Sequence, residues 1–329
     1  MDTTVVAVGI VVLGLIFDYT NGFHDCANVV STVIATRVLK PLSAIVLAGV
    51  LNTLGATQVS AVASTITSGL VNHQVVTPET ILSAIVGAIV WNVITWYYGI
   101  PSSSSYSLVG GLIGATWFSV GRGQVLWAGI LSKVIYPMIA SPFIGCFIAF
   151  CLMKVLLFLI RKKKSNSQGK LFSNLQIGSA SIVALAHGLN DAQKSMGIIT
   201  LGLFAAKMIS SQQVPFWVIV ACALVMGLGT ASGGVRIIRT VGFSITKLQP
   251  IQGFASELSA SLVILIASLL GMPISSTHMI VGSVAGSGAA TGWGRVKWSI
   301  FQKLGIGWVL TLPGSAALAA FTSFLLDLI

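Results

Sequence analysis

Charged side chains are scarce in this chain of 329 residues, since Asp, Glu, Lys and Arg together make up 8% and only seven residues are acidic. A soluble domain carries about 25% charged residues, so this shortage argues against a soluble globular protein. It also singles out the few acids that stand inside apolar runs. Burying a carboxylate there is costly, and it normally faces a partner, a cavity or a substrate pathway.

Two further absences narrow the class of protein. The four cysteines have no metal-ligand spacing, so we expect them to pack as small hydrophobic residues without a disulfide framework. No basic region precedes the first apolar run, which indicates a first membrane span and not a cleavable signal. The net charge of +11 comes from Lys and Arg gathered at the ends of apolar runs. There they orient membrane spans, and they do not point to nucleic acid.

Apolar sequence is what the chain has in abundance. Hydrophobic residues make up 55%, and windows of about 20 uncharged, mostly apolar residues recur, which is the length of a membrane-spanning helix. We therefore expect an all-α, polytopic membrane protein. The predicted spans are residues 5–36, 44–66, 81–98, 108–120, 125–160, 177–206, 216–235, 256–270, 279–291 and 304–326. The first is long for one straight crossing, so we expect a helix that is tilted, or broken near Asn21-Gly22 and Asp25.

Two polar motifs occur once in each half of the chain. Asn21-Gly22-Phe23-His24-Asp25-Cys26-Ala27-Asn28 corresponds to His187-Gly188-Leu189-Asn190-Asp191-Ala192-Gln193-Lys194. Gly99-Ile100-Pro101-Ser102-Ser103-Ser104-Ser105-Tyr106 corresponds to Gly271-Met272-Pro273-Ile274-Ser275-Ser276-Thr277-His278. We interpret the chain as an internal duplication whose polar residues are duplicated with it.

The duplication divides the chain into residues 1–160 and 175–329, joined by a basic linker at 161–174 that begins Arg161-Lys162-Lys163-Lys164. The positive-inside rule predicts that this linker is cytoplasmic and that both termini lie outside. The other basic residues that the rule places in the cytoplasm are Arg37, Lys40, Arg236, Arg239, Lys247, Arg295 and Lys297, whereas Arg122, Lys133 and Lys207 fit less well. Since each half has five spans, the halves should have opposite orientations. That is the inverted repeat of many secondary transporters.

An inverted repeat would let the two serine-rich turns enter the membrane from opposite faces as broken or re-entrant helices. The helix starts at Tyr106 and His278 would then converge on one midplane site, and helix N-termini favour anions. Unwound backbone near Asp25 and Asp191 would offer carbonyl oxygens to cations.

The candidate site residues are those that bring polar groups into these apolar surroundings. We expect Asp25 and Asp191 to coordinate cations and to approach an anion, with a structural carboxylate at a helix break as the plainer interpretation. Glu257 is a further candidate cation ligand or the acid of a salt bridge, and Asp18, which is not duplicated, ranks below it. The candidate anion ligands are Asn28, Asn190, Lys194, Ser103, Ser104, Ser105, Ser275, Ser276 and Thr277.

Each of these assignments has a simpler alternative. Asn28 and Asn190 can serve a cation or an anion, or they can only join helices by hydrogen bonds. Lys194 can neutralise Asp191 or contact the anion, and one serine of each cluster is expected to cap its helix. The histidines are expected to pack or to form hydrogen bonds and not to bind metal.

Charge then restricts how an anion can enter. Asp25, Asp191 and Glu257 contribute three negative charges when ionised, and Lys194 returns one positive charge. Each like-charge contact at 4 Å costs about 4 kcal/mol at an effective dielectric constant near 20. If the ligand is an anion, it must therefore enter together with cations or protons.

The motifs resemble those of the inorganic phosphate transporter (PiT) family of sodium- or proton-coupled symporters. Gly22–Asn28 and Gly188–Lys194 are similar to its G-x-N-D-x-A-N motif, and Pro273–His278 is similar to its P-x-S-[ST]-[ST]-H element. Pro101–Tyr106 matches that element more loosely, and Gly253–Glu257 is similar to the acidic start of a span. The resemblance covers nearly the whole chain. It implies two inverted repeats that work by alternating access, and it makes a homodimer an expectation.

The resemblance also assigns roles and shows departures. It implies substrate or cation roles for Asp25, Asn28, Asp191, Ser103, Ser104, Ser275, Ser276, Thr277 and Glu257. His24 and Lys194 stand where the motif usually has Asn, and Asn52, a candidate cation ligand, stands where some relatives have Glu. These departures leave open the number of coupled cations and the choice between Na⁺ and H⁺. The long central cytoplasmic domain of the animal relatives is absent, which implies a prokaryotic transporter.

The sequence thus predicts a secondary active transporter of the plasma (inner) membrane that carries inorganic phosphate with Na⁺, without a cofactor and without enzymatic activity. Two alternatives within transport are proton-coupled symport of neutral metal–phosphate complexes and a sulfate permease. An intramembrane hydrolase would need a nucleophile–base pair, whereas the hydroxyls here form two matching clusters without a His for each.

Overall fold

Apolar sequence in a membrane must satisfy its backbone groups internally, and helices do so within one segment. The computed structural model describes residues 2–58, 61–100, 102–161, 165–233, 238, 242–243 and 245–328, and its regular elements in these ranges are helices. The residues Pro101, Lys162 to Lys164, Arg236 and Arg239, used above, lie outside them.

Each of the ten predicted spans contains a helix, which confirms the all-α fold class. The helices are α1 (Thr3–Ala35), α2 (Pro41–Ala56), α3 (Ala61–Ser68), α4 (Pro78–Tyr97), α5 (Ser104–Ser119), α6 (Trp127–Ile130), α7 (Tyr136–Ile160), α8 (Ser165–Ala205), α9 (Phe216–Ser232), α11 (Pro250–Leu269), α12 (Ser276–Thr291) and α13 (Ser299–Asp327). A π-helical turn, Leu131–Ile135, joins α6 to α7. Among the described residues, five helical stretches are long and apolar enough to cross a membrane, or six if α2 and α3 count as one bent span. The chain is therefore a multi-pass membrane protein, and the count of ten crossings stays a prediction.

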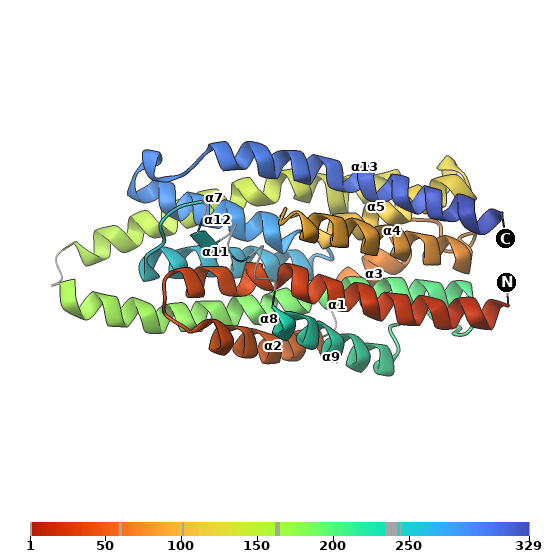
Figure 1. The fold of residues 1–329 in the computed structure, drawn as a ribbon, viewed down its shortest axis with the longest axis horizontal. Coiled ribbons are helices and arrows are strands. Elements are labelled where there is room, and N and C mark those ends of the chain that lie inside the picture. The colour runs from red at the N-terminus through yellow and green to blue at the C-terminus, as the bar shows by residue number, and fades with distance from the viewer. Residues whose placement is uncertain are drawn as a thin grey trace.

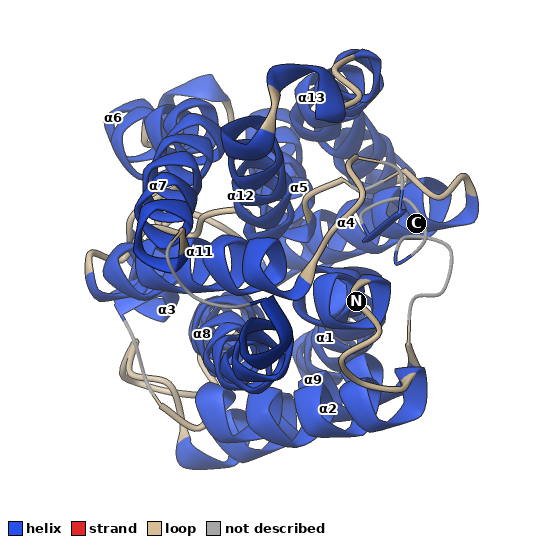
Figure 2. Cartoon of the chain, turned by 90° about the vertical axis from the view of Figure 1, so that its left-hand side faces the viewer, coloured by secondary structure: helices blue, strands red, loops and turns tan. Residues whose placement is uncertain are grey.

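The two long helices α1 and α8 pack against each other in the middle of the bundle and run in opposite directions (Figure 1). They carry the two copies of the first motif. Both chain termini lie at one end of the long axis, and the end of α7 and the start of α8 lie at the other end. Viewed along this axis, α2 and α9 lie on one side of α1 and α8, and α4, α5, α11 and α12 lie on the other side (Figure 2).

The helix break predicted near Asp25 is wrong, because α1 is continuous from Thr3 to Ala35 and α8 is continuous through Asp191. The backbones of α1 and α8 offer no unwound carbonyl oxygens beside these acids. Their neighbours on the helices are already bonded along the backbone, so other side chains satisfy the acids instead. Because α1 has 33 residues, which is long for one straight crossing, a tilted helix remains our expectation.

The breaks occur at the two serine-rich turns. Gly99 follows α4 with φ of 65° and Gly271 follows α11 with φ of 69°, a left-handed conformation that ends helices and favours glycine. The chain then turns back, so that α4 packs on α5 and α11 packs on α12. With 16 residues each, α5 and α12 are short. In Figure 1 they lie on opposite sides of the middle of the long axis.

Each short helix also packs on a helix from the other half of the chain. α5 contacts α13, and α12 contacts α7. A Cβ atom at Gly114 would lie 2.1 Å from the carbonyl oxygen of Ala316, and one at Gly286 would lie 2.0 Å from that of Cys146. These glycines therefore allow close helix packing, and they fix both short helices in the bundle.

Candidate substrate and cation site

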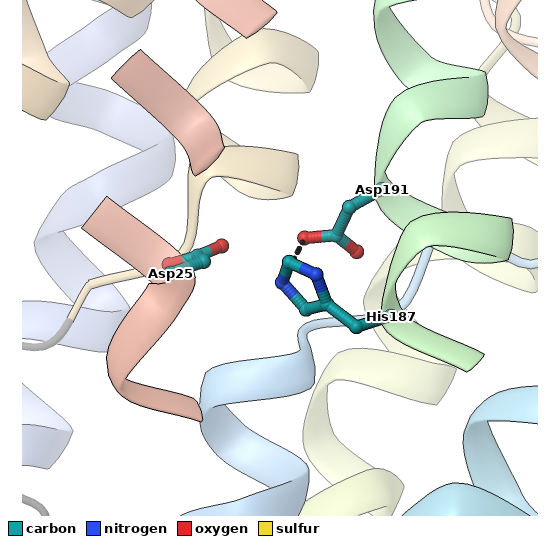
Figure 3. Close-up of side chains that lie close together, drawn as sticks. All are labelled: Asp25, His187 and Asp191. Carbon is teal, nitrogen blue, oxygen red and sulfur yellow. Dashed lines mark ion pairs between the residues drawn. The ribbon is translucent and has the colours of Figure 1, made fainter. Parts of the chain in front are cut away.

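Asp25 of α1 and Asp191 of α8 meet at the centre of the bundle. Both side chains are buried, with exposed fractions of 2% and 0%. Together with His187 they form a group in which one ligand atom from each residue lies within 4.8 Å of the other two. Figure 3 shows the two carboxylates facing each other from α1 and α8, with the imidazole of His187 beside the carboxylate of Asp191. This is a set of donors that can hold one cation.

The carboxylate of Asp25 is bonded by side chains from three helices. Its Oδ1 lies 2.8 Å from Nδ1 of His24, its neighbour on α1. Ser104, in the first turn of α5, donates to Oδ2 over 2.7 Å. Thr277, in the first turn of α12, donates to Oδ1 over 3.3 Å. Both serine-rich turns therefore reach the same acid.

The carboxylate of Asp191 has a cation beside it. Nζ of Lys194 lies 2.6 Å from Oδ1, and Nε2 of His187 lies 3.2 Å from Oδ2. Ser276 of α12 donates to Oδ2 over 3.4 Å. Lys194 is fully buried, and a buried ammonium group is costly without such a partner.

The two helix starts are joined at the site. Ser105 of α5 donates to the carbonyl oxygen of Ile274, just before α12, over 3.0 Å. Lys194 donates to the hydroxyl of Ser105 and, over 3.3 Å, to the same carbonyl. One ammonium group thus connects α8 with both serine-rich turns.

Asn28 links α1 to the start of α12. Its Nδ2 donates to Thr277 Oγ1 over 2.8 Å and to Ser276 Oγ over 3.2 Å. Its Oδ1 is buried and has no hydrogen-bond partner among the described residues. An amide oxygen in this position is available to a cation.

The caps of the short helices are as predicted. The hydroxyl of Ser103 accepts from the backbone N–H of Tyr106, and that of Ser275 accepts from the N–H of His278. These two serines are occupied by capping, while the next residues, at 104–105 and 276–277, contact the acids and Lys194.

Two of the predicted ligands point elsewhere. Asn190 donates to Ser268 Oγ over 2.8 Å and to the carbonyl oxygen of Met272 over 3.3 Å, so its amide supports the turn between α11 and α12. Asn52 donates to Thr230 over 2.8 Å, and its Oδ1 lies 3.1 Å from Nδ1 of His187. Asn52 therefore reaches the central group through the histidine and does not touch the aspartates.

Glu257 belongs to a second polar cluster. Its carboxylate accepts hydrogen bonds from Thr32 of α1 over 2.6 Å, from Gln176 of α8 over 3.0 Å, and from Ser179 of α8. It forms no salt bridge with a described residue. Thr32 lies two helical turns beyond Asp25, so this cluster continues the polar contact between α1 and α8.

The sequence predicts no role as a ligand for His187, but the structure places it in the central group with Asp25 and Asp191. Its position in the motif matches Asn21, and its spacing of four residues from Asp191 puts both on one face of α8. This four-residue spacing is the feature of the sequence that could have assigned His187 to the site. The structure brings the imidazole between Asn52 and Asp191.

The central group is negatively charged unless cations enter. With both aspartates ionised and the histidines neutral, two negative charges face the single positive charge of Lys194. The hydroxyl and amide donors above hold oxygen atoms of carboxylates and can equally hold oxygen atoms of an oxyanion. The site can therefore bind an anion and cations together.

Comparisons with known proteins agree on the family. A sequence model described as the phosphate transporter family matches residues 21–171 and 160–319. A protein of Rhizobium meliloti (strain 1021) named "probable low-affinity inorganic phosphate transporter" is 40% identical over 334 residues, covering 100% of each chain. A protein of Bacillus subtilis (strain 168) with the same name is 41% identical and covers 97% of each chain.

A solved structure has the same fold. The protein described as "the sodium-dependent phosphate transporter" superposes with a TM-score of 0.89 at 26% sequence identity, covering 99% of this chain and 100% of that chain. The likeness therefore extends over the whole bundle, including both serine-rich turns.

Proposed function

The chain belongs to the phosphate transporter family, and from this premise we propose that it carries inorganic phosphate across the plasma membrane together with sodium ions, by alternating access. Phosphate transport follows from the family, and the proposal adds the coupling ion and the mechanism. Sodium is favoured because the similar solved structure is named as sodium-dependent.

The observation that carries the proposal is the convergence of Asp25 and Asp191 with hydroxyls from both serine-rich turns. Phosphate, with one to two negative charges, would add to a group that is already negative. At 4 Å each uncompensated contact costs about 4 kcal/mol at an effective dielectric constant near 20. Sodium ions held by Asp25, Asp191 and the free Oδ1 of Asn28 offset this cost, so the two solutes bind better together than apart.

Alternating access is supported by the arrangement of the two motif copies. They lie on antiparallel helices, and the helix starts of α5 and α12 approach the site from opposite sides (Figure 1). We propose that residues 1–160 and 175–329 form inverted repeats that take turns in closing the site. The basic linker at 161–174 and both termini then lie on opposite sides of the membrane, the linker in the cytoplasm.

Lys194 supports a second candidate, proton-coupled transport of a metal–phosphate complex. The ammonium group of Lys194 pairs with a carboxylate oxygen of Asp191, so this oxygen is not available as a ligand for a sodium ion. Such a site has room for fewer sodium ions, and a divalent metal on the phosphate would supply the missing positive charge.

Flux of radioactive sodium into proteoliposomes, with and without phosphate, tests the first candidate. We expect phosphate to stimulate sodium entry and sodium to stimulate phosphate entry. Phosphate uptake that is indifferent to sodium and rises with Mg²⁺ would replace it by the second candidate. If added sulfate lowers phosphate uptake in proportion to its concentration, the substrate assignment would change to sulfate.

A further inference from the structure

Asp18 is a buried acid that the central site does not use. Its side chain is 0% exposed, and Oδ1 accepts a hydrogen bond of 2.6 Å from Ser195 Oγ. Its Oδ2 has no hydrogen-bond partner in the part of the chain that the structure describes. The ion pairs among these residues do not include it. A carboxyl group buried in this way either carries a proton or requires a cation.

The position of Asp18 relates it directly to the transport site. Asp18, Asp25 and Thr32 are spaced by seven residues, two helical turns, and so lie along one face of α1. On α8, Ser195 directly follows Lys194. The contact between α1 and α8 therefore carries three polar levels: Glu257 with Thr32, the central aspartates, and Asp18 with Ser195.

The surroundings of Asp18 contain few ligand atoms. One turn before it, Gly14 faces Ile199 of α8, and one turn after it, Gly22 faces the backbone of Met226 in α9. A hard metal ion takes about six oxygen ligands, whereas the hydroxyl of Ser195 is the one hydrogen-bond partner of the Asp18 carboxyl group in the described part of the chain. Asp18 is also no part of the group that can hold a metal ion. A proton needs only one carboxylate oxygen.

Other ionisable groups face Asp18 from two helices. Asp191 and Lys194 of α8 act on it electrostatically, and Asp18 acts on the thiol of Cys222 in α9. Helix α2 carries no ionisable side chain. The other helices packed on α1 also carry ionisable groups. These are Glu79 and Tyr97 of α4, Tyr106 of α5, Glu257 of α11 and His278 of α12.

We propose that Asp18 binds a proton that is carried with phosphate in each transport cycle. The inference rests on the proposed function and adds a proton to the sodium ions that it couples to phosphate. On the outer side, the carboxylate takes a proton from water and forms an O–H bond. On the inner side, that bond breaks and the proton passes to water. No other reactant is needed.

Electrostatics couples this proton to the substrate. Phosphate bound between the serine-rich turns competes with Asp191 for the ammonium of Lys194 and adds negative charge near Ser195. The protonated form of Asp18 then becomes more favourable, and by linkage a protonated Asp18 favours phosphate binding by the same factor. Proton and phosphate therefore enter and leave together.

The test compares the wild type with Asp18→Asn and Asp18→Glu in proteoliposomes, using ³²P-phosphate and a pH-sensitive dye in the lumen. Two readouts are taken. One is exchange of phosphate at equal concentrations on both sides, which needs no net proton movement. The other is phosphate accumulation driven by an inward proton gradient, with the accompanying acidification of the lumen.

We expect Asp18→Asn to exchange phosphate within about twofold of the wild type and to lose gradient-driven accumulation and proton entry by about tenfold or more, because the amide cannot release a proton. Asp18→Glu should retain both. Equal proton entry in Asp18→Asn and the wild type would overturn the inference, and so would loss of exchange in both variants, since that indicates a structural role. Phosphate exchange absent in the wild type would instead remove the proposed function itself.

Discussion

The ammonium nitrogen of Lys194 lies 2.6 Å from Oδ1 of Asp191, three residues earlier on α8. In the first motif the matching position holds Asn28, whose amide oxygen is unpartnered among the described residues. The two halves therefore compensate their central acids differently. The second half carries its own positive charge, and the first half leaves an oxygen ligand open for a cation from solution.

Replacing Lys194 by Asn should make the second half resemble the first. In Lys194→Asn, Asp191 loses its fixed counter-charge, and a sodium ion becomes the means to offset the charge. We expect the ratio of sodium to phosphate taken up to rise by about one, since one unit of positive charge is replaced. Parallel uptake of ²²Na⁺ and ³²P-phosphate measures this ratio. Lys154→Asn, on the exposed side of α7, is the matched control, and an unchanged ratio in Lys194→Asn would argue against a cation site at Asp191.

The two aspartates should differ in what their loss does to stability. Asp25→Asn and Asp191→Asn are each expected to abolish phosphate uptake. Asp191→Asn also leaves the ammonium of Lys194 buried without its partner, which costs about 3–5 kcal/mol, whereas Asp25 has no such cation beside it. Thermal unfolding in detergent should therefore show a lower Tm for Asp191→Asn than for Asp25→Asn.

A double variant separates folding from transport in this prediction. Adding Lys194→Met to Asp191→Asn removes the unpaired charge, so the Tm should recover most of its loss while uptake remains absent. Near-normal uptake in either single variant would remove the acid from the site. A Tm that stays low in the double variant would show that the ion pair is not the cause of the instability.

Much of this molecule follows from local sequence. Apolar runs place the helices, and the proline, serine and glycine at each turn place the break, because Gly99 and Gly271 adopt the left-handed conformation and the serines cap the next helix. The duplication also selects Asp25 and Asp191 as the residues that meet. These features depend on residues close together in the chain.

What sequence did not predict depends on contacts between distant segments. The orientation of Asn190 toward Ser268, and of Asn52 toward His187, is decided by which helix packs beside each amide. The continuity of α1 through Asp25 has the same origin. Hydroxyls from α5 and α12 satisfy the carboxylate from outside, so the helix has no need to open its own backbone.

Close packing of the short helices gives a prediction about stability. Gly114→Ala and Gly286→Ala would each place a methyl group about 2 Å from a backbone carbonyl of the facing helix, and a backbone cannot move aside as a side chain can. We expect each to destabilise the protein by about 1–3 kcal/mol, seen as a lower Tm. Gly123→Ala, where a Cβ would meet nothing within 4 Å, is the control and should leave the Tm nearly unchanged. Equal Tm values for all three would contradict the close approach of these helices.

Glu257 provides a prediction on sodium binding away from the phosphate. Its carboxylate receives three hydrogen bonds, from Thr32, Gln176 and Ser179, and thereby joins α11 to both central helices. If Glu257 is a cation ligand, as the sequence predicts, then Glu257→Gln retains the size and part of the hydrogen bonding but removes the charge that attracts the ion. The sodium concentration for half-maximal uptake should rise by about tenfold, since loss of one charge–charge contact is worth at least 1.4 kcal/mol, while the KM for phosphate at saturating sodium stays near its wild-type value.

If the role of Glu257 is purely structural, the opposite result is expected. The Thr32→Val variant distinguishes this structural role from a role in sodium binding. This substitution removes one hydrogen bond to the carboxylate and keeps its charge, at a cost of about 1–3 kcal/mol from the lost partner. If the charge matters for sodium, Thr32→Val lowers the Tm with a small change in sodium dependence, and Glu257→Gln shifts sodium dependence with a small change in Tm. If both variants instead lower the Tm and neither changes the response to sodium, the cluster only holds three helices together, and the sodium ions must be assigned to Asp25 and Asp191 alone.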